Sequence, residues 1–128
     1  MRANRARDTG PEMALRRAAT AAGLRGYRLH VKGLPGKPDL AFTRYKVAVF
    51  VHGCFWHRCP VCNPPAPKRH AAFWRRKFAE NQERDARKSA ALELRGWAVI
   101  EVWECELRAN KARCVTRLSR AIAAAGDE

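Results

Sequence analysis

Two apolar runs dominate the pattern of hydrophobic and polar positions along the chain. They are VAVFV, within a predicted strand at 46–51, and WAVIEVW at 97–103, each short enough for a strand that is buried on both faces. A shorter run, DLAF, begins at Asp39 after a turn rich in Gly and Pro at 32–38. Residues 27–31 predict one more strand, so the pattern indicates four in all.

Helical patterns surround these strands. Thr9 and Glu12 fit a capping box at the start of a helix whose apolar stripe stops at Gly23. Glu12 is therefore either a helix cap or a residue near a metal. A long helix is predicted over 71–95, and Asn110 can cap a last helix. The apolar candidates of the long helix are Phe73, Phe78, Ala90, Leu92 and Leu94.

The order of these elements predicts the fold class. A short connection follows DLAF, so strand 46–51 should pair antiparallel with it, whereas the long helix favours a parallel strand 97–103. The result is an α/β protein with a mixed central sheet flanked by helices. With no repeats, a single domain is expected at 9–128, after a flexible basic arm at 1–8.

The charge of the chain indicates nucleic acid as a binding partner. Its 128 residues include 26 Lys and Arg against 12 Asp and Glu, a formal net charge of +14. Such a charge favours a polyanionic partner over a generically basic surface. No apolar stretch approaches a membrane span and no signal-peptide pattern opens the chain, so no membrane association is expected. Five cysteines, an odd number, argue against a disulfide framework.

Asp39 and two histidines form the first group of candidate catalytic residues. Asp39 opens the strand next to 46–51, and His52 and His57 follow the end of that strand, so one cleft should hold all three. A carboxylate is a ligand for Mg²⁺, and an imidazole exchanges protons near neutral pH. Asp85 on the long helix is a candidate to orient one histidine. The alternatives are a turn-capping Asp39, structural histidines and a solvated Asp85.

The cysteines form a second group. Cys54, Cys59 and Cys62 lie in one loop, and the C-x-x-C unit that ends it has the spacing of structural zinc sites. Cys105 follows the last predicted strand and should emerge beside this loop if the two long strands are parallel. A four-cysteine zinc site is therefore predicted, with four reduced, buried cysteines as the alternative. Cys114 is left over as an ordinary buried thiol.

Aromatic side chains form a third group, made of Phe55, Trp56 and Trp74. Core packing is the usual role of such residues. In a short, polar loop of a basic protein, however, they could insert between base steps, which unstacks DNA most easily where pairing is already defective. This hypothesis makes them a wedge that senses a mismatch.

Five segments of the chain together resemble the Vsr family of very short patch repair endonucleases. They are DTGPEMALR, LPGKPDLAF, VAVFVHGCFWHRC, FWRRKFAENQERDARK and GWAVIEVWEC, and the likeness covers roughly residues 8–107. Members of that family have a restriction-endonuclease-like fold and nick DNA 5′ to the T of a T:G mismatch. The resemblance implies a mismatch endonuclease that acts in very short patch repair of deaminated 5-methylcytosine.

The resemblance also implies a catalytic centre. The family's catalytic positions fall on Asp39, His52, His57, Asp85 and Glu12. Catalytic Mg²⁺ would be held by Asp39 and the backbone carbonyl of Val51. The expected general base is His57, and Asp85 would orient His52 or keep it charged; the two histidine roles could be exchanged.

Zinc and DNA positions follow in the same way. Structural Zn²⁺ falls on Cys54, Cys59, Cys62 and Cys105, and the wedge falls on Phe55, Trp56 and Trp74. The implied partner is double-stranded DNA with a T:G mismatch, and other mismatch-repair proteins are further candidates. The expected protein is a monomer in the bacterial cytoplasm, associated with the nucleoid.

Two alternatives stay open at the level of sequence. One is a related restriction-endonuclease-like nuclease with a different DNA specificity, which a comparison of T:G and matched duplexes would identify. The other is a non-catalytic, zinc-stabilised DNA-binding module, which would show no Mg²⁺-dependent cleavage.

Overall fold

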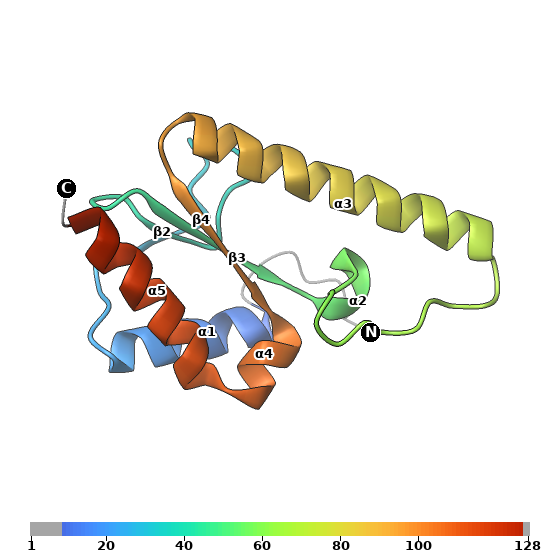
Figure 1. Cartoon of the computed structure of the whole chain (residues 1–128), viewed down its shortest axis with the longest axis horizontal. Helices are drawn as coiled ribbons and strands as arrows, with labels where there is room; N and C mark the ends of the chain where they lie inside the picture. Colours follow the sequence, from blue (N-terminus) through green and yellow to red (C-terminus); the bar gives the residue numbers. More distant parts are fainter. Residues whose placement is uncertain (1–8, 127–128) are drawn as a thin grey trace.

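A mixed sheet of four strands lies at the centre of the computed structural model, which describes residues 9–126 (Figure 1). In chain order and in sheet order the strands are β1 (Arg28–Leu29), β2 (Leu40–Phe42), β3 (Val47–His52) and β4 (Ala98–Trp103). Antiparallel pairing joins β1 to β2 and β2 to β3, and parallel pairing joins β3 to β4. These directions confirm the predicted mixed sheet. The arm predicted at 1–8 lies outside the described residues.

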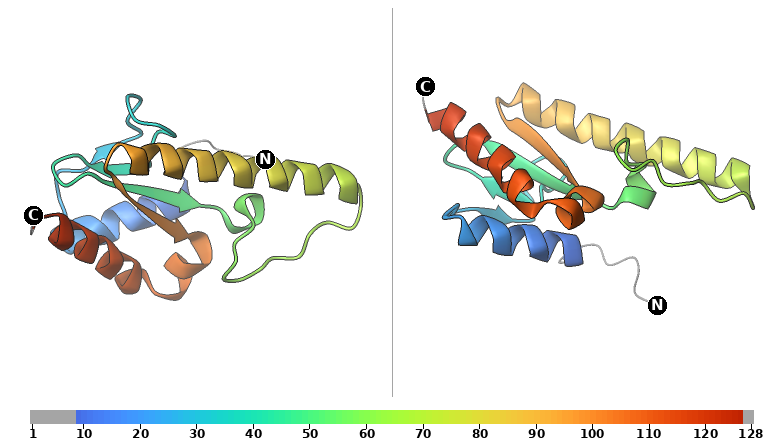
Figure 2. Two further views of the ribbon diagram at one scale, coloured as in Figure 1. Left: turned by 45° about the horizontal axis from the view of Figure 1, so that its top comes forward. Right: turned by 60° about the horizontal axis from the view of Figure 1, so that its bottom comes forward.

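Side-chain alternation along β3 divides the core into two layers. Val47 and Val49 pack in a cluster with α1 (Gly10–Ala21), α4 (Glu104–Ala109) and α5 (Lys111–Gly126). Ala48 and Phe50, on the other face, pack with Leu92 of α3 (Ala71–Leu94). Figures 1 and 2 show α3 on one side of the sheet and α1 and α5 on the other. Burial on both faces explains why β3 has no polar residue before His52.

The long helix α3 buries less of its surface than the sequence predicted. Phe78 and Leu92 are buried, but Phe73 is 44% exposed and Leu94 is 89% exposed. Leu94 was a wrong core prediction because two positions along an α-helix turn the side chain by about 200°, away from the face of Leu92. The first turns of α3 extend beyond the sheet and lie beside α2 (Cys54–His57) instead (Figure 2).

Three local features differ from the predicted elements. The strand expected over 27–31 contains only two residues, because His30 has a left-handed backbone (φ 48°) that ends the pairing. The short helices α2 and α4 occupy segments for which the sequence predicted none. Helices of four and six residues have almost no intrinsic stability, so tertiary packing determines whether they form.

No helix among residues 9–126 is long and apolar enough to cross a membrane.

Candidate active site and metal centre

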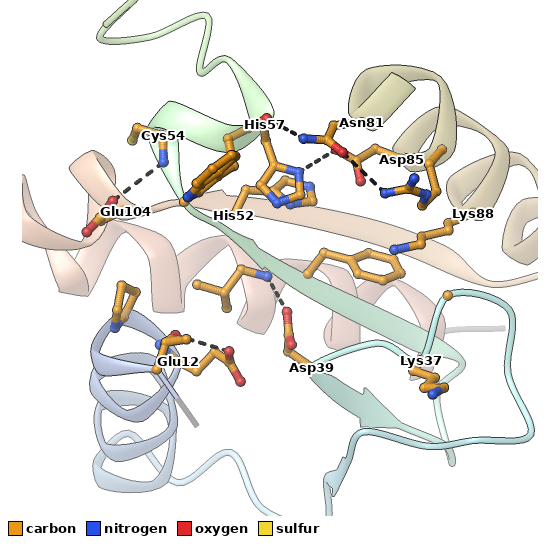
Figure 3. Close-up of a pocket in the computed structure, with 18 of the residues that line it drawn as sticks. Glu12, Lys37, Asp39, His52, Cys54, His57, Asn81, Asp85, Lys88 and Glu104 are labelled. Atoms are coloured by element: carbon orange, nitrogen blue, oxygen red, sulfur yellow. Dashed lines mark hydrogen bonds and ion pairs between the residues drawn. The ribbon is translucent and has the colours of Figure 1, made fainter. Parts of the chain in front are cut away.

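A cavity of about 1160 Å³ opens where β3 ends, between α1, α2 and α3 (Figure 3). Glu12, Asp39, His52, His57 and Asp85 all line it, although they come from four separate elements and a loop. Cationic side chains share the cavity wall: Lys32, Lys37, Arg84 and Lys88. The cavity therefore combines acid–base groups with the positive charge that a phosphate requires.

Asp39 is fixed by the strand that it faces. It lies directly before β2, and its Oδ2 accepts a hydrogen bond of 2.7 Å from the backbone N–H of Val51. Burial raises the pKa of Asp39 to about 6, and the nearby Glu12 carboxylate adds to this effect, while the Val51 hydrogen bond opposes it. A buried carboxylate beside a second one suits a bound cation, so Asp39 has the chemistry of a Mg²⁺ ligand.

His57 and Asp85 form a short polar contact across the cavity. The Nδ1 atom of His57, at the end of α2, lies 2.6 Å from Oδ2 of Asp85 in the middle of α3. Burial raises the pKa of Asp85, but the hydrogen bond and the charge of His57 outweigh it and lower the pKa below its ordinary value. Because an ionised carboxylate only accepts, Nδ1 carries a proton, and Nε2 of His57 is the nitrogen left for chemistry.

His52 has a different carboxylate partner from the one that the sequence suggested. Its ring is buried, lies 4.4 Å from the ring of His57 at an interplanar angle of 33°, and lies 4.9 Å from that of Trp103. The Nε2 atom of His52 is 3.7 Å from Oε2 of Glu101, and this contact is the main cause that lowers the pKa of Glu101. The prediction that Asp85 orients His52 thus differs from the observed pairing, in which Asp85 contacts His57.

Glu12 and His30 occupy the side of the cavity next to Asp39. Glu12 is 3% exposed, although Thr9 caps α1 by accepting from its N–H, as the capping box predicted. One ring nitrogen of His30 is 3.6 Å from Glu12 Oε1, and the other is 3.9 Å from Asp39 Oδ1. Glu12 therefore belongs to the capped first turn of α1 and also lies near Asp39.

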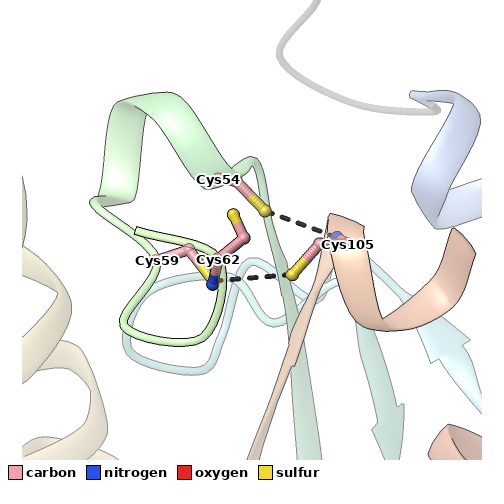
Figure 4. A group of neighbouring side chains, drawn as sticks. All are labelled: Cys54, Cys59, Cys62 and Cys105. Atoms are coloured by element: carbon pink, nitrogen blue, oxygen red, sulfur yellow. Dashed lines mark hydrogen bonds between the residues drawn. The ribbon is translucent and has the colours of Figure 1, made fainter. Parts of the chain in front are cut away.

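The four predicted zinc ligands lie together (Figure 4), and one of them, Cys54, also lines the cavity. Sulfur atoms of Cys54, Cys59, Cys62 and Cys105 all lie within 4.8 Å of one another. The Cys59 and Cys105 sulfurs are 3.7 Å apart, and a zinc ion with Zn–S bonds of about 2.3 Å requires a separation of about 3.8 Å. The cluster can therefore hold a metal such as zinc.

Backbone N–H groups are already directed at these sulfurs. The N–H groups of Val61 and Cys62 donate to Cys59 Sγ at 3.3 and 3.5 Å, and that of Cys105 donates to Cys54 Sγ at 3.3 Å. Burial raises the pKa of Cys54 to about 11. Burial also raises that of Cys59, but the donated hydrogen bonds outweigh it and lower the pKa. The loop is thus shaped to stabilise at least one thiolate before any metal binds.

The proposed wedge aromatics belong to a larger cluster between α2 and α3. Phe55 lies at its centre, with ring centroids 5.2 Å from Trp56, 5.6 Å from Trp74 and 5.3 Å from Phe78. Trp56 is the outer member, with 38% of its surface exposed. Core packing and exposure are therefore combined in one cluster, and Trp56 is the most exposed of the three proposed wedge residues.

Sequence reasoning missed His30 and Glu101. His30 follows β1, a strand of two exposed residues, and its contacts depend on α1, which is far away in sequence. A signal was available for Glu101, because it is the one charged residue inside the apolar run of β4. Asn81 was also missed; it shares a helical stripe with Phe78 and Asp85 and donates to the Trp56 carbonyl at 3.1 Å.

Comparison with known proteins gives one family. The sequence profile described as "DNA mismatch endonuclease Vsr" matches residues 1–62. The DNA mismatch endonuclease Vsr of Escherichia coli K12 is 41% identical over 113 residues, which is 87% of this chain and 70% of that protein.

Two type II nicking enzymes are similar to the same extent. V.NmeAIP of Neisseria meningitidis is 42% identical over 91% of this chain and 81% of its own length. V.XorIIP of Xanthomonas oryzae is 45% identical over 80% of this chain and 75% of its own length. The chain therefore belongs to the Vsr family of DNA mismatch endonucleases and is an endonuclease, as its motifs predicted.

Proposed function

We propose that the protein is a Mg²⁺-dependent endonuclease that nicks one DNA strand 5′ to the T of a T:G mismatch, in very short patch repair of deaminated 5-methylcytosine. The observation that carries this proposal is the convergence of Asp39 and the His57–Asp85 pair in one cationic cavity at the end of β3. These three residues lie in one chain, and we expect the protein to act as a monomer. We place the enzyme in the bacterial cytoplasm, where its DNA substrate lies.

The side chains of the cavity suggest a division of labour. Mg²⁺ bound by Asp39 and the Val51 carbonyl would stabilise negative charge at the scissile phosphate and the leaving oxygen. His57 takes a proton from the attacking water through Nε2, because Asp85 holds the proton on Nδ1. His52, next to Glu101, donates toward the phosphate, and Glu12 orients groups near Asp39. A closed set of four thiolates leaves zinc a purely structural role.

Duplex binding should depend steeply on salt, because cationic side chains neutralise phosphates and release counterions. Each neutralised phosphate contributes about −0.9 to the slope of log K against log salt, so the expected slope has a magnitude of about 4 or more. Lys37→Ala in the cavity wall should reduce this magnitude by about 1. Arg120→Ala on α5, away from the cavity, is the matched control and should leave the slope unchanged. A flat salt dependence would contradict duplex binding by this surface.

Trp56→Ala tests the wedge. If Trp56 enters the base stack beside the mismatch, its removal should abolish the preference for T:G over matched duplex, because opening the stack is easiest at a mispair. Since Trp56 is 38% exposed, the loss of stability should stay well below the about 3–5 kcal/mol of a buried aromatic truncation.

Phe78→Ala is the matched control for this experiment, because Phe78 is buried in the same aromatic cluster. It should lower the melting temperature strongly and leave the T:G preference intact. Melting of the free protein and nicking rates on both duplexes are measured for each variant. If Trp56→Ala is unstable and still prefers the T:G duplex, Trp56 is a core residue and not a wedge.

Nicking of a T:G duplex in Mg²⁺, compared with the matched duplex of the same sequence, tests the proposed function directly. Strand-selective nicking 5′ to the mismatched T is expected. Equal cleavage of both duplexes would favour a related nuclease with a different specificity. Tight binding without cleavage would favour the DNA-binding module.

A further inference from the structure

We propose that His30 is a positioning residue for the catalytic carboxylate: held by Arg16 in the tautomer with its proton on Nδ1, it directs that proton at Asp39. This inference rests on the proposed role of Asp39. It concerns a histidine that no sequence motif of the chain singled out.

The tautomer follows from the donor inventory of arginine. Nη2 of Arg16 lies 3.1 Å from Nε2 of His30 and 3.5 Å from Oε1 of Glu12. A guanidinium only donates hydrogen bonds, so Nε2 of His30 must accept. A neutral imidazole that accepts through Nε2 carries its proton on Nδ1. Arg16 therefore determines which face of the His30 ring is the donor.

The donor face of His30 points at the oxygen of Asp39 that the sheet does not use. Oδ2 of Asp39 accepts from the Val51 N–H at 2.7 Å, and Oδ1 lies 3.9 Å from Nδ1 of His30. This distance is about 1 Å longer than an N–H···O hydrogen bond, so forming the bond requires the ring to rotate toward Asp39. Each carboxylate oxygen then faces one neutral donor, which orients Asp39 and leaves its remaining lone pairs for a cation.

The backbone holds His30 in place for this contact. Its φ of 48° lies in the left-handed region, which few residues other than glycine adopt, and histidine is one of those enriched there. The side chain is only 14% exposed and lines the cavity. Because Nε2 is engaged by Arg16, His30 is not expected to bind a metal, although it lies close to Glu12 and Asp39.

Two substitutions that both fit a positive φ test the proposal. His30→Gly removes the side chain without backbone strain, and His30→Asn keeps an N–H donor near the Nδ1 position. Loss of a residue that orients a metal ligand lowers activity by about 10–100-fold. We expect that loss in kcat for His30→Gly, a higher Mg²⁺ requirement, an almost unchanged KM for duplex, and recovery of most of the activity in His30→Asn.

His70→Gly is the matched control, since His70 is also a histidine with positive φ (58°) but is exposed and lies outside the cavity wall. Its kcat should equal that of the wild type. Thermal melting of all three variants separates loss of folding from loss of function. Equal kcat values for His30→Gly and His30→Asn, or an unchanged His30→Gly, would overturn the positioning role.

Two spectroscopic measurements decide the chemistry without relying on nicking. Ring ¹⁵N resonances of the metal-free protein should show His30 with its proton on Nδ1, and Arg16→Met should shift it toward Nε2. Pulsed EPR of Mn²⁺ bound to the protein should show the same nitrogen couplings in the wild type and in His30→Asn. A coupling that is lost in His30→Asn would make His30 a metal ligand and refute the proposal. If Asp39→Asn nicks normally, the proposed function fails, yet the tautomer is still settled by the ring resonances.

Discussion

Asp39→Asn is expected to lower kcat for nicking a T:G duplex by at least about 10³-fold, the equivalent of about 4 kcal/mol of transition-state stabilisation. Asparagine keeps an oxygen that can accept from the Val51 N–H, so the local geometry should survive. What disappears is the negative charge that would hold Mg²⁺. Duplex affinity should change little, because the net charge of +14 supplies it.

The same substitution should stabilise the metal-free protein at neutral pH. The pKa of Asp39 is raised from 3.8 to about 6 in the folded state, so the folded chain binds this proton more tightly than the unfolded chain. Ionised Asp39 therefore destabilises the fold, fully above pH about 6 and not at all below pH about 3.8. A shift of about two pKa units corresponds to about 3 kcal/mol.

Melting of both proteins without Mg²⁺ checks this expectation. Asp39→Asn should be more stable at pH 8, and the difference should vanish near pH 4. Asp85→Asn is the control of opposite sign, because the contact with His57 lowers the pKa of Asp85 and its charge stabilises the fold at neutral pH. A nicking rate near that of the wild type in Asp39→Asn would show that the catalytic carboxylate lies elsewhere.

Cys105→Ser should remove the bound zinc and lower the melting temperature by more than about 10 °C. Structural zinc contributes of order 10 kcal/mol to the folding of small zinc domains, and several kcal/mol would be lost here. The loop that carries Cys54, Cys59 and Cys62 has few apolar contacts of its own, and Val61 is 63% exposed. Because His57 and Trp56 lie in the same segment, nicking should fall together with stability.

Cys114→Ala is the matched control, since Cys114 is 1% exposed but lies on α5, outside the four-sulfur cluster. Metal analysis should find one zinc per chain in the wild type and in Cys114→Ala, and none in Cys105→Ser. The melting temperature of Cys114→Ala should fall only slightly. Wild-type protein purified without chelator that contains no zinc would exclude the four-cysteine site.

Local pattern was sufficient for the sheet. The apolar run of β3 must be buried on both faces, and the length of α3 forces β4 to return parallel to it, so strand directions followed from sequence. The C-x-x-C spacing likewise predicted that Cys59 and Cys62 lie close together, and the structure places both in one cluster. The weaker predictions concerned the ends of elements: Leu94 at the end of α3 faces solvent, and β1 stops before His30.

The residue types of the site were determined by sequence, and their partners by tertiary structure. Asp39, His52 and His57 were recognisable because they are polar residues at the ends of apolar strands. Which carboxylate meets which histidine depends on the parallel register of β4 and on the rotation of α3 about its axis. His30 needs Arg16 on α1, a contact between elements that no local pattern encodes. The sequence specifies which side chains are present. Their hydrogen-bond partners, and the atoms that carry the protons, are decided only when packing brings distant elements within hydrogen-bond range.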